Sequence, residues 1–276
     1  LALARGSNCF HIWVIMYRLE MQDVPATGAV RLDGLDVQAD EWALFIDIDG
    51  TLLDMAPTPD AVRVPPGLVS TLTHLSQSFR GAVALITGRR VADADRFFAP
   101  LKLAVSGVHG AEARNGRDDR IALLAGPVPD DLAAAVHDAA LARPGILVED
   151  KGAALAVHYR NAPETRAELE LELRRAVARW EGFAVRTGRK VLDVVPEAHS
   201  KATGLAWIMT LPAFHGRRPI MIGDDHGDES AIRAAERLGG IGLTVAGEHF
   251  GPERADFLTP ASVRSWLASL CRNDGA

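Results

Sequence analysis

WALFIDIDGTLLD, residues 42 to 54, starts with an unbroken apolar run and then places Asp47 and Asp49 ahead of a glycine and a threonine. A short apolar run rich in strand formers is typical of a strand buried on both faces of a parallel sheet. Both carboxylates then lie at the carboxyl edge of that sheet, where ligands of open α/β folds bind. Because close carboxylates repel each other, the pair requires a cation such as Mg²⁺ or a shared proton. For one aspartate alone, a turn with a helix cap would suffice.

Strands and helices alternate after this stretch. We expect a helix over 65–79, a strand over 82–87, a helix over 91–98 and a strand over 103–107, and later a helix over 201–211, a strand over 219–223, a helix over 228–238, a strand over 241–245 and a helix over 260–271. Pro66 suits the first turn of the first helix. This rhythm predicts a doubly wound, mostly parallel α/β sheet.

The rhythm changes between residues 109 and 198. Here we expect a helix over 130–143, strands over 145–150 and 153–160, a helix over 163–180, and strands over 183–188 and 190–195. Such an αββαββ unit is a complete antiparallel layer with helices on one face. We therefore predict an inserted α+β domain over 109–198, with the α/β core formed by 41–108 and 199–272.

Composition excludes several classes of protein. The 276 residues suffice for one large domain or two modest ones. A net charge of −6 and a pI near 5.9 provide no basic field for nucleic acid. Cys9 and Cys271 support neither a disulfide framework nor a zinc site, which favours a reducing cytoplasm. The oligomeric state stays open, and a monomer is compatible with the sequence.

The first 40 residues differ from the rest. Their apolar patch, residues 10–17, is followed by Arg18 and Glu20 where a signal peptide would have its cleavage site. The patch is also shorter than the ~20 residues that a membrane span needs. We interpret residues 1–40 as an N-terminal extension, disordered or produced by a misplaced start site, with Met21 as a candidate start.

Three further polar groups lie at strand ends or helix starts of the predicted sheet. Thr87 follows an apolar strand, and Lys201 begins a helix, where the dipole disfavours a cation unless an anion is near. The third group is the acids after the strand at 219–223, namely Asp224, Asp225, Asp228 and Glu229. Alone, each has a plain interpretation as a strand-end threonine, a surface lysine or an acidic helix start. Their occurrence together argues against coincidence.

This set of residues suits phosphoryl transfer. A carboxylate that attacks phosphorus forms an acyl phosphate, which divides hydrolysis into two displacements. Mg²⁺ would screen that carboxylate from the phosphate, with Asp224 completing its oxygen ligands. Thr87 and Lys201 can hold the phosphoryl oxygens. The second acid, two residues further on, can protonate the leaving alcohol and then deprotonate water.

DIDGT (47–51), ITGR (86–89), SK (200–201) and GDD (223–225), in this order, resemble the motifs of the haloacid dehalogenase superfamily of phosphatases. The resemblance implies a nucleophile, a general acid/base, a bound Mg²⁺, and a cap domain that closes over the substrate. The residues that it implies are the nucleophile Asp47, the acid/base Asp49, the phosphate holders Thr87 and Lys201, the metal ligands Asp47, Asp49 (through its backbone carbonyl) and Asp224, and the supporting acids Asp225 and Asp228.

Longer stretches, from about Trp42 to the end of the last strand, resemble trehalose-6-phosphate phosphatases. They include SGVHGAEARNG (106–116), DKGAALAVHYRNAP (150–163), TGRKVLDVVP (187–196) and GDDHGDES (223–230). This narrower resemblance implies a sugar-phosphate substrate, a role in trehalose biosynthesis, and sugar-binding residues that the cap supplies. The substrate-binding positions expected here are Gly88, Arg89, His109, Glu112, Lys151, His158, Arg160, Arg189 and Asp193.

The chain also departs from the pattern of that family. It has Asp193 and Val195 where glutamate and a basic residue are usual, Ala202 in place of a glycine, and Gly227 in place of a threonine. These departures bear on substrate binding more than on the reaction. The alternatives are therefore a phosphatase of another sugar phosphate, such as mannosyl-3-phosphoglycerate or sucrose 6-phosphate, a phosphotransferase such as a mutase, and a non-catalytic sugar-phosphate sensor.

Overall fold

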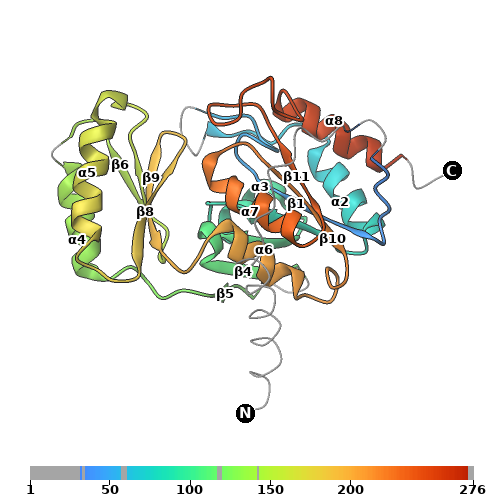
Figure 1. Cartoon of the computed structure of the whole chain (residues 1–276), viewed down its shortest axis with the longest axis horizontal. Helices are drawn as coiled ribbons and strands as arrows, with labels where there is room; N and C mark the ends of the chain where they lie inside the picture. Colours follow the sequence, from blue (N-terminus) through green and yellow to red (C-terminus); the bar gives the residue numbers. More distant parts are fainter. Residues whose placement is uncertain (1–31, 33–34, 57–60, 117–119, 142, 273–276) are drawn as a thin grey trace, which may run out of the picture.

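The structure is a computed structural model that describes residues 32, 35–56, 61–116, 120–141 and 143–272. Most of the predicted extension over 1–40, with its candidate start at Met21, lies outside the described residues. The described chain forms a larger and a smaller unit side by side (Figure 1). Within it, no helix combines the length and the apolar character that crossing a membrane requires.

A seven-stranded sheet forms the centre of the larger unit. Its strands, in spatial order, are β11 (Ile241–Thr244), β10 (Arg218–Gly223), β1 (Trp42–Ile46), β2 (Val83–Ile86), β3 (Ala104–Gly107), β4 (Glu112–Asn115) and β5 (Ala122–Leu123). The first five run parallel, and β4 and β5 join antiparallel. β1 is buried along its whole length, as its apolar run predicted. The predicted mostly parallel α/β sheet is confirmed.

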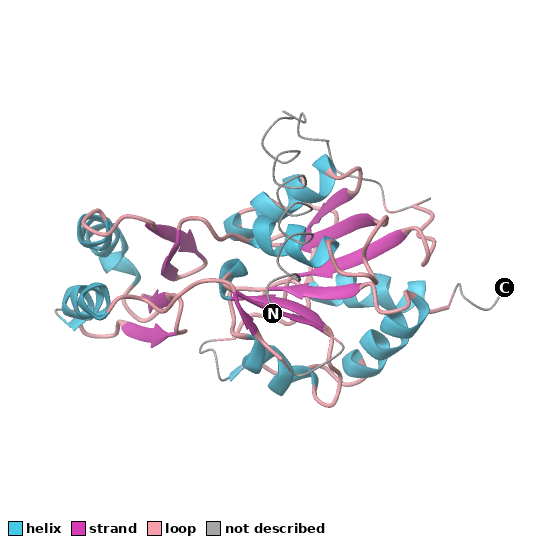
Figure 2. Ribbon diagram, turned by 90° about the horizontal axis from the view of Figure 1, so that it is seen from below, coloured by secondary structure: helices cyan, strands magenta, loops and turns pink. Residues whose placement is uncertain are grey.

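Helices lie on both faces of this sheet (Figure 2). They are α2 (Leu68–Ser78), α3 (Val91–Phe98), α6 (Lys201–Met209), α7 (His226–Arg237) and α8 (Pro260–Leu270). Helix α6 packs on α7, and α2 packs on α8. Pro66 precedes α2 instead of standing in its first turn, because Gly67, with a φ of 82°, is the N-cap. The placement of Pro66 was therefore wrong, although the helix itself is confirmed.

The predicted start of the inserted domain at residue 109 was also wrong. A short 3₁₀ turn, η2 (Val108–Gly110), reverses the chain, and β4 then pairs antiparallel with β3. Strands β4 (Glu112–Asn115) and β5 (Ala122–Leu123) therefore continue the large sheet before the chain leaves it. The sequence did not predict β4, because its EARN stretch has two charged side chains and no apolar run.

The smaller unit, residues 128–196, is called the cap from here on. Its elements follow the predicted αββαββ order: α4 (Asp130–Leu141), β6 (Leu147–Asp150), β7 (Leu155–His158), the 3₁₀ turn η3 (Pro163–Thr165), α5 (Arg166–Val177), β8 (Phe183–Gly188) and β9 (Val191–Pro196). The strands form an antiparallel sheet in the order β6-β7-β9-β8. Helices α4 and α5 cover the outer face of this sheet, and its other face is turned toward the large sheet (Figures 1 and 2).

Candidate active site

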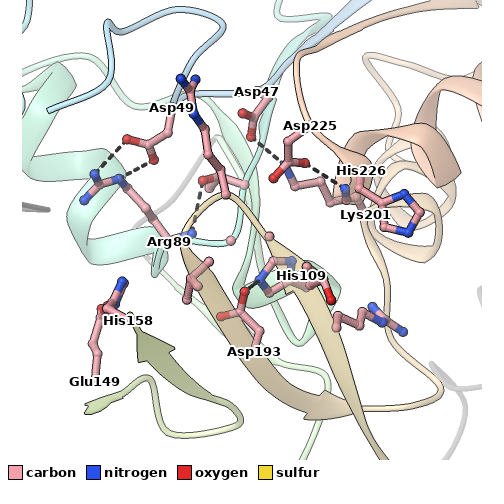
Figure 3. A pocket seen from close by; sticks show the side chains of 18 of the residues that line it. Asp47, Asp49, Arg89, His109, Glu149, His158, Asp193, Lys201, Asp225 and His226 are labelled. Carbon is pink, nitrogen blue, oxygen red and sulfur yellow. Dashed lines mark hydrogen bonds and ion pairs between the residues drawn. The ribbon is translucent and has the colours of Figure 1, made fainter. Parts of the chain in front are cut away.

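A cavity of about 540 Å³ lies between the carboxyl edge of the large sheet and the inner face of the cap sheet (Figure 3). Both units contribute side chains to it. The predicted site residues that line it are Asp47, Asp49, Thr87, Gly88, Arg89, His109, Lys151, His158, Arg160, Arg189, Asp193, Lys201, Asp224 and Asp225. Segments more than 150 residues apart in the sequence thus meet in one place.

Three buried carboxylates share one ammonium group at the core side of the cavity. Carboxylate oxygens of Asp47, Asp224 and Asp228 lie within 4.8 Å of one another. Lys201 Nζ donates to Asp47 Oδ1 at 2.8 Å and to Asp228 Oδ1 at 2.7 Å. Helix α6 begins at Lys201, behind a capping box at the N-cap Ser200, so the helix start fixes the position of the lysine. We refer to these three aspartates as the acid cluster.

The acid cluster carries more negative charge than its lysine can neutralise. Burial, and then the charge of Asp228, raise the pKa of Asp47 well above its usual range. Burial and the neighbouring Asp225 raise the pKa of Asp224 to about 6, and burial raises that of Asp228 to about 7. An all-oxygen donor set with excess negative charge is what a divalent cation such as Mg²⁺ prefers. These residues therefore fit a metal ion.

The turn behind β1 brings the first and last acidic motifs together. Strands β1 and β10 are parallel neighbours with Ile46 opposite Ile222, so both strands end at the same edge. A Cβ on Gly50, whose φ is +87°, would lie 2.2 Å from Asp224 Oδ2. Thr51 Oγ1 donates to Asp224 Oδ1 at 3.1 Å. Glycine at position 50 is therefore required both for the turn and for the approach of Asp224.

The carboxylate of Asp49 points away from the acid cluster. Arg89 donates to it from Nε at 2.5 Å and from Nη2 at 2.7 Å, in the fork geometry drawn in Figure 3. Such a bidentate pair fixes the planes of both groups. The side chain of Asp49 thus faces the cavity from another direction than Asp47, which is compatible with a metal contact through its backbone carbonyl alone.

Thr87, Gly88 and His109 form the wall beside Asp49. Thr87 is buried, and its Oγ1 accepts the backbone N–H of Arg89 at 3.1 Å. His109 has a φ of 53°, and its backbone N–H donates to the carbonyl of Thr87 at 3.2 Å. A Cβ on Gly88 would lie 2.7 Å from the imidazole of His109. The glycine therefore leaves the space in which this imidazole sits.

Asp193 joins the cap to this wall. Its Oδ1 accepts a hydrogen bond from Lys151 Nζ at 3.4 Å, and its Oδ2 lies 3.3 Å from His109 Nε2. Burial alone would raise the pKa of Asp193, but the positive charges of Lys151 and His109 outweigh it and hold the pKa far below the usual range. We refer to Asp193, Lys151 and His109 as the cap cluster.

The cap also meets the core at two other points. Arg160 Nη1 donates to the carbonyl of Ala56 at 2.7 Å. Arg189, between β8 and β9, places its Nε 3.4 Å from Glu248 Oε1 in the loop after β11. Both arginines therefore hold the cap against the core as well as lining the cavity.

Three predicted residues make contacts beyond those that the sequence indicated. Glu112 lies on β4 of the large sheet, so its assignment to the cap was wrong; its carboxylate accepts the backbone N–H of Val91 at the start of α3, away from the cavity lining. Asp225 is the N-cap of α7. Asp228 completes that capping box and also joins the acid cluster. Asp225 therefore does belong to an acidic helix start, as the simpler interpretation of the sequence predicted, and it also lines the cavity.

Sequence reasoning missed Glu149, which lines the cavity. His158 Nε2 lies 2.9 Å from Glu149 Oε2, and the hydrogen bond from His158 lowers the pKa of this glutamate against the effect of burial. A signal was present, since Glu149 is a charged residue inside a predicted strand. The sequence alone could not show that Glu149 meets His158, because this contact depends on the antiparallel register of β6 and β7. In that register Leu147 lies opposite His158, so Glu149 is only two residues from the position opposite His158.

Comparison with known proteins identifies the family. Residues 45–254 match the trehalose-phosphatase family. The chain belongs to this family. It is 43% identical over 222 residues to a probable trehalose-phosphate phosphatase of Sinorhizobium fredii, covering 80% of this chain and 83% of that relative. It is 36% identical over 207 residues to the trehalose-6-phosphate phosphatase of Escherichia coli, covering 74% and 77%.

A solved structure confirms the fold of this family member. The C-terminal domain of the Candida albicans trehalose-6-phosphate phosphatase superposes with a TM-score of 0.75 at 19% identity, covering 85% of this chain and 93% of that one. At this identity the match concerns the fold alone. The resemblance to trehalose-6-phosphate phosphatases, inferred from the longer stretches between Trp42 and the last strand, is confirmed at the level of the family.

Proposed function

We propose that this protein hydrolyses trehalose 6-phosphate to trehalose and phosphate through a phosphorylated Asp47. The observation that carries the proposal is the meeting of Asp47, Asp49, Thr87 and Lys201 at one sheet edge, facing a cavity whose other wall is the polar face of the cap. Membership of the trehalose-phosphatase family supports the choice of substrate.

In the first step, an oxygen of Asp47 attacks phosphorus while the bond from phosphorus to the sugar oxygen breaks. Lys201, which donates to Asp47 Oδ1, holds the carboxylate in place and neutralises part of the charge on the transferring phosphoryl group. Thr87 offers its hydroxyl to a phosphoryl oxygen at the same edge. A divalent cation such as Mg²⁺, held by Asp47, Asp224 and Asp228 or the carbonyl of Asp49, would supply the remaining charge compensation.

Proton transfer is the role that we assign to Asp49. Protonated Asp49 gives its proton to the leaving sugar oxygen, and its carboxylate then takes a proton from the water that attacks the phosphorylated aspartate. That second attack breaks the bond between Asp47 and phosphorus and releases phosphate. In the structure, Arg89 donates hydrogen bonds to both carboxylate oxygens of Asp49. A bound phosphate gives Arg89 another anionic partner, which frees Asp49 to carry the proton.

The cap supplies the groups that a sugar needs. Lys151, His158 and Arg160 line the cavity opposite the acid cluster and provide donors for hydroxyl groups. These residues favour a disaccharide phosphate over mannosyl-3-phosphoglycerate, and the relatives favour trehalose 6-phosphate over sucrose 6-phosphate. An intact set of catalytic side chains disfavours a non-catalytic sensor, and a cap whose polar face suits a disaccharide disfavours a mutase.

A phosphate-release panel tests the proposal. Trehalose 6-phosphate, sucrose 6-phosphate, glucose 6-phosphate and mannosyl-3-phosphoglycerate are each supplied to the protein with Mg²⁺ and with a chelator. We expect release from trehalose 6-phosphate to exceed the others by at least about 100-fold in kcat/KM, which corresponds to about 2.7 kcal/mol, and to stop with the chelator. Equal rates on all four would overturn the substrate, and undiminished release with the chelator would overturn the role of the metal.

A further inference from the structure

A second group of metal-binding side chains lies outside the acid cluster. His226 and Glu229 stand on the first turn of α7, three residues apart and therefore on one face of the helix. His249 reaches them from the loop after β11. Ligand atoms of the three side chains lie within 4.8 Å of one another. The proposed hydrolysis uses none of the three.

The distances within this group suit an ion better than direct contact. Glu229 Oε2 lies 3.4 Å from His226 Nδ1 and 3.8 Å from His249 Nε2. Both separations are longer than a good hydrogen bond. With metal–ligand bonds of about 2.0–2.1 Å, ligand atoms of a tetrahedral zinc site are about 3.3 Å apart. The two separations that involve Glu229 are thus close to those of such a site, and all three ligand atoms lie within 4.8 Å of one another.

The surroundings hold the three ligands in this arrangement. Arg233 Nη2 donates to the other oxygen of Glu229, Oε1, at 2.5 Å, which leaves Oε2 directed at the two histidines. The His249 ring packs edge to face on His226, with centroids 5.1 Å apart, and on Phe250, with centroids 4.5 Å apart. An arginine that orients a ligating carboxylate is the kind of supporting contact that metal sites use.

The chemistry of these ligands differs from that of the acid cluster. Two imidazole nitrogens and one carboxylate favour a borderline transition ion such as Zn²⁺, whereas the all-oxygen acid cluster favours Mg²⁺. The His226 side chain is 64% exposed, so a fourth ligand can come from solvent. Figure 3 shows His226 next to Asp225, at the edge of the cavity.

We propose that His226, Glu229 and His249 form a binding site for a divalent transition ion, with Zn²⁺ as its representative, separate from the catalytic metal. An ion there joins the first turn of α7 to the loop after β11. That loop also carries Glu248, the partner of Arg189 of the cap. The bound ion therefore stiffens the part of the core on which this side of the cap rests.

Calorimetric titration of Zn²⁺ into the full chain, with excess Mg²⁺ present, tests the site. We expect one zinc per chain with a micromolar dissociation constant. His249→Gln should weaken the binding at least about 10-fold, because even the loss of a supporting residue costs a metal site that much. His74→Gln, which changes an exposed histidine on α2, should leave the affinity unchanged.

Two further measurements separate this site from the acid cluster. In Asp224→Asn the zinc affinity should persist, since that residue belongs to the other group. Co²⁺ should give the strong visible absorption of a tetrahedral ion in the parent and lose it in His226→Gln, with circular dichroism showing that the variant is folded. Equal zinc affinity in the parent and His249→Gln, or zinc binding that is lost in Asp224→Asn and kept in His249→Gln, would overturn the proposal.

Discussion

The acid cluster and the cap cluster each bury aspartate beside lysine, yet their pKa values move in opposite directions. In the acid cluster three carboxylates face one ammonium, and burial with mutual repulsion raises the pKa values of Asp47, Asp224 and Asp228. In the cap cluster one carboxylate, Asp193, faces Lys151 and His109, and their charges lower its pKa against the effect of burial.

The difference teaches that the balance of negative and positive charges around a buried acid, and not burial alone, decides whether its pKa rises or falls. The acid cluster is incomplete by itself and is therefore suited to receive a cation and a phosphate. The cap cluster is complete, so its role is to hold His109 and the cap in position. Four experiments test this contrast, in order of decreasing effect.

Asp47→Asn should give the largest change, a loss of more than about 10³-fold in kcat, or about 4 kcal/mol, because it removes the nucleophile. In the presence of a chelator its thermal stability should equal or exceed that of the parent, since one repelling charge is gone. Phosphate release and thermal unfolding measure the two effects. Asp131→Asn, at an exposed position on α4, is the control. A clear loss of stability in Asp47→Asn would contradict the excess of negative charge.

Mg²⁺ should stabilise the parent against unfolding by about 2.7 kcal/mol at 100 times its dissociation constant. Asp224→Asn should lose this increment, because it removes a ligand from the acid cluster. Asp193→Asn should retain it, since the cap cluster needs no metal. Chemical denaturation with and without Mg²⁺ measures the increments, and an equal increment in both variants would contradict the assignment.

Asp193→Asn should destabilise the protein by about 1–3 kcal/mol, because Lys151 remains buried without its counter-charge. Since the pKa of Asp193 is lowered on folding, its contribution is present above the unfolded value of about 3.9 and is lost as the pH falls toward the folded value. Denaturation of parent and variant from pH 6 downward should show a difference that is constant near pH 5–6 and shrinks below about pH 4. A difference that grows on acidification would have the wrong sign.

Gly88→Ala should lower kcat/KM by about 10-fold, or about 1.4 kcal/mol, because the new methyl group displaces the imidazole of His109 from Asp193. Phosphate-release kinetics over a range of substrate concentrations measure the change. Gly126→Ala, where nothing lies within 4 Å of the added carbon, is the matched control. Equal kinetics in the two variants would show that the position of His109 does not matter.

Much of the core could be predicted because its signals are local. An apolar run such as residues 42–46 predicts a buried strand, and a polar group after such a run must lie at the sheet edge. Asp47, Thr87 and Asp224 were found in this way, Lys201 was found from its place at a helix start, and all four line the cavity.

The cap contacts were harder to predict because they depend on how strands pair and on how the two units meet. The pairing of Glu149 with His158 requires the register of β6 with β7. The fork between Arg89 and Asp49 joins residues 40 apart. The sequence of β4, with its charged Glu112 and Arg114, has no apolar pattern that would reveal a strand.

The sequence by itself determined the α/β core, the αββαββ order of the cap, and the chemical character of the residues at the sheet edge, because these follow from local periodicity and motif order. Only the tertiary structure decided the charge balance. Because both the repulsion between like charges and the attraction between opposite charges fall off with distance, the charged side chains next to each buried aspartate set its pKa. The two aspartates of DIDGT illustrate this, since Asp47 faces Lys201 and two acids while Asp49 faces Arg89.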